Sequence, residues 1–146
     1  MDRDGFSLVE LLLVLLLLGV GSLIVLPAID RRFNENAVKQ TALGLAATAR
    51  SLRGRALYEG SPQRLILDPA ENSYEVQGGK KTYLSTHVHF ADITGGELGE
   101  RQERRFIFFP NGSVLGGEVA IKGEGTAAIY SVRLETLSGR VLVEEG

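Results

Sequence analysis

The chain has no cysteine and no tryptophan, and its 146 residues include only four prolines and two histidines. Without cysteine there is no disulfide framework, no thiol nucleophile and no thiolate metal site. The 16 basic and 18 acidic residues nearly cancel, so the chain lacks the net positive charge of a polybasic nucleic-acid binder. A content of 44% hydrophobic residues excludes a disordered chain. The length suits one small domain with one additional segment.

Charge is also absent from a long stretch near the N-terminus. From Leu11 to Ile29, 19 consecutive residues carry none. At about 1.5 Å per helical residue, this run matches the ~30 Å of a bilayer core, whereas a secretory signal has a shorter apolar region of about 7–15 residues. The run therefore predicts one membrane-spanning helix. Glu10 lies at its N-terminal edge, where an ionisable side chain usually has a partner and a function.

The sequence Gly-Phe-Ser-Leu-Val-Glu at residues 5–10, followed directly by a leucine-rich run, resembles the processing motif of type IV pilins and type II secretion pseudopilins. In that family, a prepilin peptidase cuts after the glycine and methylates the new N-terminus. The resemblance implies cleavage between Gly5 and Phe6 and N-methylation of Phe6. It also implies that Glu10 pairs with the N-terminal amine of a neighbouring subunit during assembly. A buried ammonium would then neutralise a buried carboxylate.

The charges that flank the apolar run predict a membrane orientation opposite to that of this family. The leader at residues 1–5 has one basic and two acidic residues, whereas Arg31 and Arg32 follow the run. The positive-inside rule alone would place the C-terminal body in the cytoplasm. The family places that body outside, and the motif must face its peptidase. We therefore expect a single-pass protein of the bacterial inner membrane with its C-terminal domain in the periplasm.

The helical pattern continues beyond the apolar run, so the sequence predicts one long helix from residue 6 to residue 58. Pro27 would allow a kink or end the membrane segment, and Gly60 and Pro62 mark the end of the helix. One apolar stripe follows a spacing of four and three residues. It consists of Val38, Ala42, Leu45, Ala49, Leu52 and Ala56. We expect a leader at 1–5, a transmembrane helix at 6–29, a scaffold helix at 30–60 and an antiparallel β domain at 61–146.

After Gly60 the pattern changes to short alternating segments separated by turn residues, which is typical of antiparallel sheet. The predicted strands are 64–67, 73–76, 83–90, 105–109, 117–122, 128–134 and 140–143. Residues 93–104 combine three glycines with many charges and are expected to form an exposed loop. The expected fold class is α+β, with the long N-terminal helix packed on the β domain, as in pilins.

The C-terminal half adds a second resemblance. Phe109-Pro110-Asn111-Gly112, then Gly-Gly at 116–117, a strand, and Ser-Gly-Arg-Val at 138–141 are similar to the globular domain of the protein H and FimT family. The resemblance implies a structural subunit, not an enzyme, of the type II secretion pseudopilus, at or near its tip, used in protein export across the outer membrane. Its implied partners are major and minor pseudopilins and the prepilin peptidase. The alternative is a FimT-like minor pilin of a type IV pilus, acting in DNA uptake.

The sequence shows no well-spaced chemical site. His87 and His89 would share one face of a strand, but two ligands without a third favour polar sheet residues over a metal site. The glycine-rich stretches lack nucleotide-binding motifs, and Glu97, Glu100 and Glu103 are interpreted as a solvated loop. We expect no cofactor, no metal and no small-molecule substrate. The third class considered is a membrane-anchored enzyme, but the sequence lacks the catalytic residues that such an enzyme would need.

Arg50, Arg53 and Arg55 form the strongest basic cluster, in a segment, 30–58, that has six cations and two anions. One interpretation is nucleic-acid binding by the helix, and another is charge complementarity between neighbouring subunits. Near the C-terminus Arg140 stands alone and two glutamates close the sequence. Because phosphate binding needs clustered cations, we expect no nucleic-acid partner.

Overall fold

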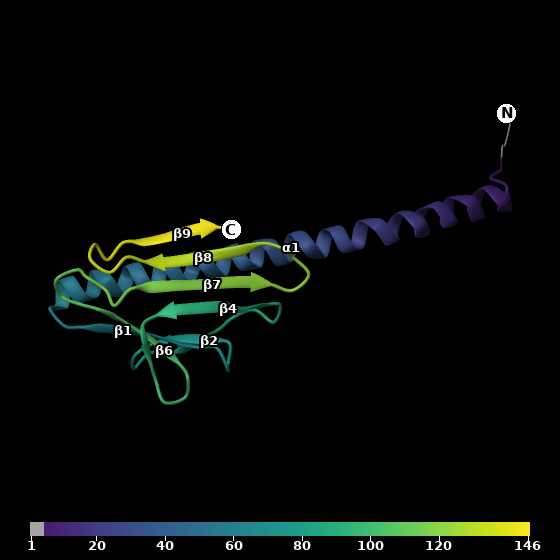
Figure 1. Cartoon of the computed structure of the whole chain (residues 1–146). Helices are drawn as coiled ribbons and strands as arrows, with labels where there is room; N and C mark the ends of the chain where they lie inside the picture. Colours follow the sequence, from purple (N-terminus) through teal and green to yellow (C-terminus); the bar gives the residue numbers. More distant parts are fainter. Residues whose placement is uncertain (1–4) are drawn as a thin grey trace. The chain divides into compact units, whose positions relative to one another are not determined.

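The computed structural model describes residues 5–146, without the side chains of residues 25–28. These residues form one α-helix and nine β-strands (Figure 1). Helix α1 runs from Leu8 to Glu59, two residues later at its start than the sequence predicts and one residue later at its end. The helix continues through Pro27. The chain divides into two compact units, one reaching to Phe33 and one from Asn34 to Gly146.

The second unit contains two antiparallel sheets. Sheet A has the strand order β3-β2-β1-β6-β5, and sheet B has the order β4-β7-β8-β9. The strands of sheet A are β1 (Gln63–Asp68), β2 (Ser73–Val76), β3 (Lys81–Tyr83), β5 (Glu97–Leu98) and β6 (Arg104–Phe108). Those of sheet B are β4 (Val88–Gly95), β7 (Gly117–Gly123), β8 (Ile129–Leu134) and β9 (Val141–Glu145). The expected fold class, a long helix with an antiparallel β domain, is confirmed.

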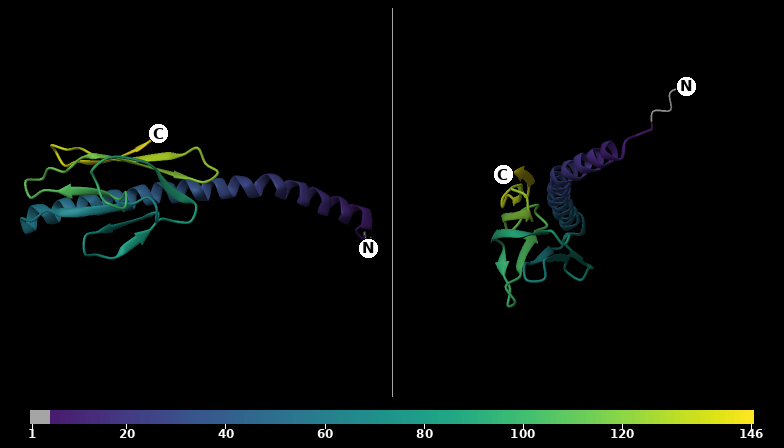
Figure 2. Two further views of the ribbon diagram at one scale, coloured as in Figure 1. Left: turned by 60° about the horizontal axis from the view of Figure 1, so that its bottom comes forward. Right: turned by 90° about the vertical axis from the view of Figure 1, so that its right-hand side faces the viewer.

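The part of α1 that belongs to the second unit packs against both sheets, as the two views of Figure 2 show. The predicted stripe supplies the helix side of the core, and each of its six members is at most 1% exposed. Ala46 lies on the same face and is also buried. The sheets contribute Leu65, Phe106 and Ile121 among others. Four of the seven helix residues in the core are alanines, so the backbone of α1 approaches the sheets closely.

The prediction that residues 93–104 form an exposed loop is wrong for part of this segment. Ile93 to Gly95 continue β4, and Glu97 and Leu98 form β5, which pairs with β6. Two strands approach each other closely at Gly95: it lies opposite Gly117, and a Cβ atom at Gly95 would overlap the Gly116 carbonyl oxygen. Gly95 also has a φ of 74°, a conformation that glycine adopts without strain.

The predicted strand at residues 83–90 also differs from the structure. The chain forms β3, which ends at Tyr83, and then starts β4 at Val88. The two strands belong to different sheets, and the segment between them carries the chain from sheet A to sheet B. Alternation along the sequence does not reveal such a change of sheet, because both strands have the same period.

Candidate functional site

The first described residues, Gly5 and Phe6, lie outside α1. Both are exposed, and the Phe6 side chain is 82% exposed. Ser7 precedes the helix and caps it: its Oγ accepts a hydrogen bond from the Val9 amide at 3.3 Å, and its carbonyl accepts one from the Leu11 amide at 3.1 Å. The Gly5–Phe6 peptide bond is therefore accessible and has no helical hydrogen bonds to break.

Glu10 is the third residue of α1 and is exposed. Its carboxylate lies in the first helical turn, where the unpaired amides and the helix dipole favour a negative charge. Among residues 5–146, no basic side chain forms an ion pair with Glu10.

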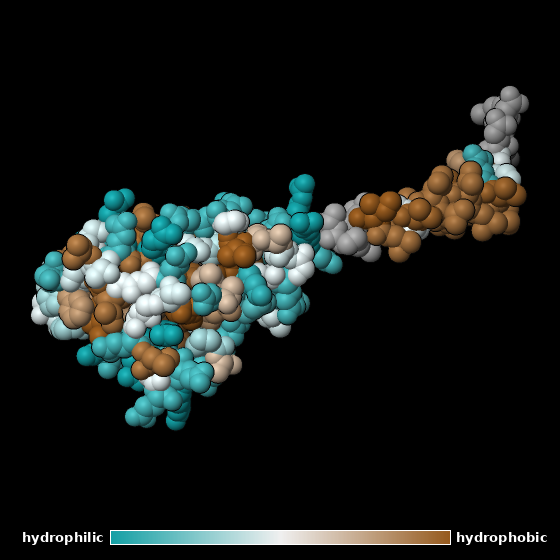
Figure 3. All heavy atoms as spheres, viewed as in Figure 1, coloured by the Kyte–Doolittle hydropathy of each residue, from teal (hydrophilic) through white to brown (hydrophobic). Residues whose placement is uncertain are grey.

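The apolar run that follows Glu10 faces outward on every side of the helix. From Leu11 to Leu18, each side chain is between 44% and 64% exposed. Figure 3 shows apolar residues covering the visible surface of this segment. The helix is long and apolar enough to span a membrane, and none of its most apolar stretch is buried. A helix that is hydrophobic all round needs an apolar environment, from lipid or from other helices.

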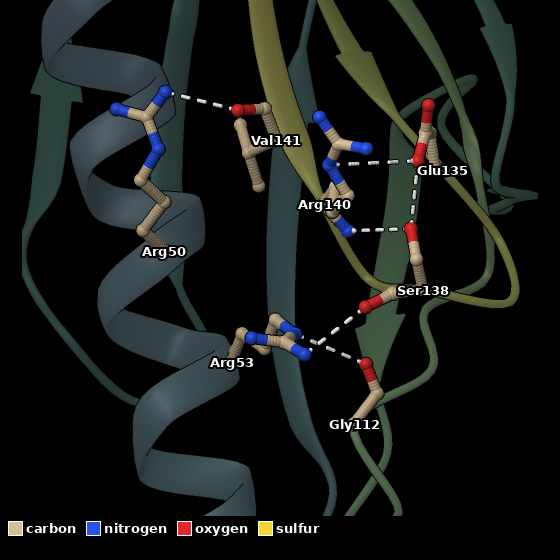
Figure 4. Close-up of polar contacts among 7 residues, drawn as sticks. All are labelled: Arg50, Arg53, Gly112, Glu135, Ser138, Arg140 and Val141. Atoms are coloured by element: carbon tan, nitrogen blue, oxygen red, sulfur yellow. Dashed lines mark hydrogen bonds and ion pairs between the residues drawn. The ribbon is translucent and has the colours of Figure 1, made fainter.

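Two members of the arginine cluster bind the β domain. The Arg53 guanidinium donates hydrogen bonds to the carbonyl oxygens of Gly112 at 3.1 Å and Ser138 at 3.0 Å, and Arg50 donates one to that of Val141 at 2.9 Å (Figure 4). Arg55 pairs with Glu59 one helical turn later. Sequence reasoning identified the cluster but missed these contacts, because the acceptors are backbone atoms 59 to 91 residues away.

The two histidines do not converge on a shared site. The His87 Nδ1 atom lies 3.2 Å from the Glu124 carboxylate. His89 belongs to β4 and pairs with Lys122 of β7. In the part of the chain that the structure describes, no three His, Cys, Asp or Glu residues gather as metal ligands.

Among the three glutamates predicted to form a solvated loop, Glu103 has fixed contacts. Its side chain is only 13% exposed and pairs with Arg105. Hydrogen bonds from its own backbone amide, from the Arg105 side chain and from the Arg101 amide lower the pKa of the Glu103 carboxyl, against a smaller opposing effect of burial. Glu97 and Glu100 are exposed, as expected.

A shallow cavity of about 220 Å³ lies over sheet A. Its lining includes Ser73, Lys81 and Arg105. Two of its charged groups pair with nearby side chains: Lys81 with Glu71, which raises the pKa of Lys81, and Arg105 with Glu103. Asp68, Glu75 and Arg101 also line the cavity. The buried Ser73 hydroxyl has no hydrogen-bond partner among the described residues, so no base is bonded to it.

Comparisons with known proteins agree with the N-terminal features. Residues 1–26 match the family described as the prokaryotic N-terminal methylation motif. Gly5, Phe6 and Glu10 all lie within this matched segment.

The chain is also similar to a curated protein, the type II secretion system protein H of Xanthomonas campestris pv. campestris. The two sequences are 28% identical over 116 residues, which cover 79% of this chain and 69% of the relative. The similarity therefore extends well beyond the N-terminal motif into the β domain.

Two solved structures of the minor pseudopilin EpsH from the type II secretion system of Vibrio cholerae share the fold. One matches with a TM-score of 0.60 over 73% of this chain and 95% of that chain. The other matches with a TM-score of 0.57 over 75% and 94%. Sequence identity is 14% in both alignments, so this likeness concerns the fold.

Proposed function

We propose that the chain belongs to the protein H family of type II secretion pseudopilins and that it is built into a pseudopilus as a structural subunit at or near the tip, in the service of protein export. The observation that carries this proposal is the N-terminal segment: an exposed Gly5–Phe6 bond, then Glu10, then an apolar helix. The partners would be major and minor pseudopilins. The minor pseudopilin fold and the protein H relative support it.

Processing is the first step of the proposed function. A prepilin peptidase would cut between Gly5 and Phe6 and methylate Phe6. The position of this bond before the Ser7 cap supports the assignment, because a peptidase needs an extended substrate. Mass spectrometry of the chain from secretion-competent cells should find methylated Phe6 as the first residue. Gly5→Val should retain residues 1–5, whereas Ser7→Ala should still be processed. An uncut wild-type chain would contradict the assignment.

Assembly would depend on Glu10. An unneutralised carboxylate in the membrane costs roughly 2.5–3.5 kcal/mol at the centre of a helix and less near its ends. A neighbouring Phe6 amine would remove this cost and would fix the register between subunits. Glu10→Ala should impair secretion and copurification of the other pseudopilins, while Glu10→Asp should retain part of both. Normal secretion and copurification with Glu10→Ala would contradict this role.

The proposed location is the bacterial inner membrane, with the second unit in the periplasm. The apolar helix supports membrane anchoring. A reporter enzyme that is active only outside the cytoplasm, fused after Gly146, should be active. A fusion active only in the cytoplasm would instead support the topology that Arg31 and Arg32 favour by the positive-inside rule.

The alternative, a FimT-like minor pilin in DNA uptake, is less well supported. Nucleic-acid binding needs exposed cations that are available to phosphates. Arg50 and Arg53 donate hydrogen bonds to backbone carbonyls, and Arg140 lies 4.0 Å from the Glu135 carboxylate. In an electrophoretic mobility shift with the full chain in detergent, we expect no binding. A salt-sensitive shift of duplex DNA would favour the pilus function.

A further inference from the structure

The turn at residues 109–113 contains the dipeptide Asn111-Gly112, to which the proposed function gives no role. The other asparagines of the chain, at positions 34, 36 and 72, precede glutamate, alanine and serine. An asparagine that precedes glycine is the most prone to lose its side-chain amide. The reason is that glycine has no side chain to hinder the attack of its backbone nitrogen on the neighbouring carboxamide. Asn111 is therefore the position of this chain where spontaneous deamidation is chemically easiest.

The fold requires both residues of this reactive pair. Gly112 has a φ of 87°, which glycine adopts without strain, and a Cβ atom at this position would lie 3.4 Å from the Arg53 guanidinium. The Asn111 Oδ1 atom accepts hydrogen bonds from the Ser113 amide at 3.0 Å and from the Ser113 hydroxyl at 2.7 Å. The geometry of the turn thus explains the presence of a chemically labile dipeptide.

The nitrogen atom that would attack the carboxamide is held in place. The Gly112 amide donates a hydrogen bond to the Phe109 carbonyl oxygen at 2.9 Å, which closes the turn. From α1, Arg53 holds the Gly112 carbonyl oxygen at 3.1 Å (Figure 4). Asn111 is exposed, whereas Gly112 is buried. The carboxamide is accordingly open to water, but the attacking nitrogen belongs to a buried residue with hydrogen bonds on both of its backbone groups.

The native contacts of the turn are incompatible with ring closure. Cyclisation requires the Gly112 nitrogen to lose its hydrogen, which is the donor of the bond to Phe109. It also requires the Asn111 side chain to turn from Ser113 towards that nitrogen. The turn must therefore open locally before the reaction, and the free energy of this opening slows the reaction in the folded chain.

From these contacts we propose that Asn111 is a deamidation site that Arg53 protects in the folded chain and that reacts when the turn opens. Hydroxide removes the proton of the Gly112 nitrogen, which then bonds to the Asn111 Cγ atom. The bond between Cγ and Nδ2 breaks, and ammonia leaves with a proton taken from water. Water then opens the cyclic succinimide at either carbonyl and leaves aspartate or isoaspartate at position 111. This inference is independent of the proposed function.

The two products differ in their effect on the turn. Aspartate leaves the main chain unchanged, and its carboxylate can still accept the hydrogen bonds from Ser113. Isoaspartate adds a methylene group to the main chain between position 111 and Gly112, so the Gly112 carbonyl oxygen no longer lies where Arg53 binds it. A chain with isoaspartate therefore loses one of the contacts that attach α1 to the β domain.

The test follows deamidation of the full chain in detergent micelles at mildly alkaline pH. Trypsin releases the peptide from Phe106 to Lys122, which contains Asn111 as its single asparagine. Mass spectrometry detects the replacement of the amide NH2 by OH, and chromatography separates aspartate from isoaspartate. The folded wild-type chain should react at least about ten-fold more slowly than the same chain in urea. Asn111→Asp should abolish the mass change and so confirms the site.

Variants separate opening of the turn from unfolding of the whole unit. Without urea, Arg53→Ala should speed the reaction about three- to ten-fold, because it removes the anchor of the Gly112 carbonyl. Ala49→Leu is the control, since it disturbs the core and leaves the contacts of the turn in place; its rate should stay near that of the wild type. Ser113→Ala, which removes the hydroxyl bond to Asn111, should give an increase of about two-fold.

Three results would overturn the proposal. Equal rates for the folded and the urea-unfolded wild-type chain would show that the turn gives no protection. Equal acceleration by Arg53→Ala and Ala49→Leu would show that the reaction follows global unfolding and not opening of the turn. If Arg53→Ala does not fold, Ser113→Ala decides the outcome: a folded Ser113→Ala chain that reacts at the wild-type rate would show that the contacts of the turn do not control Asn111.

Discussion

The Arg53 side chain of α1 donates a hydrogen bond to the Gly112 carbonyl oxygen at 3.1 Å across 59 residues of sequence. The same guanidinium reaches Ser138, so one side chain holds the helix and two separate turns of the β domain (Figure 4). These turns belong to segments that are continuous with sheet A and sheet B respectively. Arg53 thereby fixes the helix against both sheets near the end of α1.

Arg53→Ala should destabilise the second unit by about 2–4 kcal/mol, because it removes two charge-assisted hydrogen bonds and leaves two carbonyl groups without their donor. The measurement is urea unfolding of the full chain in detergent, followed by tyrosine fluorescence. Arg55→Ala is the matched control: it removes an exposed ion pair with Glu59, worth at most about 0.5 kcal/mol. Equal effects of the two substitutions would contradict the role given to Arg53.

Ala49→Leu should cost about 1–3 kcal/mol, because Ala49 is fully buried where α1 approaches the sheets and the larger side chain cannot fit without shifting them. Ala47→Leu, two residues earlier on the exposed face, should change stability by no more than about 0.5 kcal/mol. Thermal unfolding of both variants by circular dichroism checks this. A tolerated Ala49→Leu would mean that the core has unfilled space beside the helix.

Gly95→Ala should destabilise the fold more than Gly125→Ala. Both glycines have positive φ, 74° and 66°, so alanine costs about 1–2 kcal/mol at either position. Only at Gly95 does the new Cβ also collide with backbone atoms, those of Gly116 and Gly117, whereas the space beside Gly125 is open. The difference between their urea midpoints measures the collision alone, and equal midpoints would show that β4 and β7 can separate without cost.

Glu103→Gln should weaken the fold at neutral pH and have no effect in acid. The pKa of this carboxyl is lowered in the folded chain, by its own backbone amide first and by Arg105 among the other donors. A carboxyl with a lowered pKa stabilises the fold above its ordinary value of 4.5 and loses that contribution as the pH falls through the folded value. Unfolding midpoints at several pH values should therefore converge below pH 4.5. Glu100→Gln, at an exposed position of the same hairpin, should show no such dependence.

Most of the fold could be predicted because its signals are periodic. The stripe from Val38 to Ala56 is buried as the spacing of the sequence requires, and β2 has the predicted bounds. The segment at residues 93–104 could not be predicted, since glycine at a close approach between strands and glycine in a loop look alike in sequence. Glycine is needed at positions 95 and 117 because these residues pair across two strands that are far apart in the chain.

The candidate site also has one part that the sequence predicts and one part that only the fold brings together. The positions of Gly5, Phe6 and Glu10 follow from a short contiguous motif, so they are available before any folding. The contacts of Arg53 are not contiguous: it reaches Gly112 and Ser138 only because α1, the turn at 109–113 and the β8–β9 turn come together.

The sequence by itself determined the apolar helix, the processing motif and the register of the buried stripe, because each depends on residues within a few turns of one another. The tertiary structure decided the use of the arginines. By composition Arg50 and Arg53 are a basic cluster open to nucleic acid or to a neighbouring subunit, and in the folded chain both bind carbonyl oxygens of the β domain. Backbone acceptors leave no mark in the sequence, since every residue has one, and only the fold selects which of them an arginine can reach.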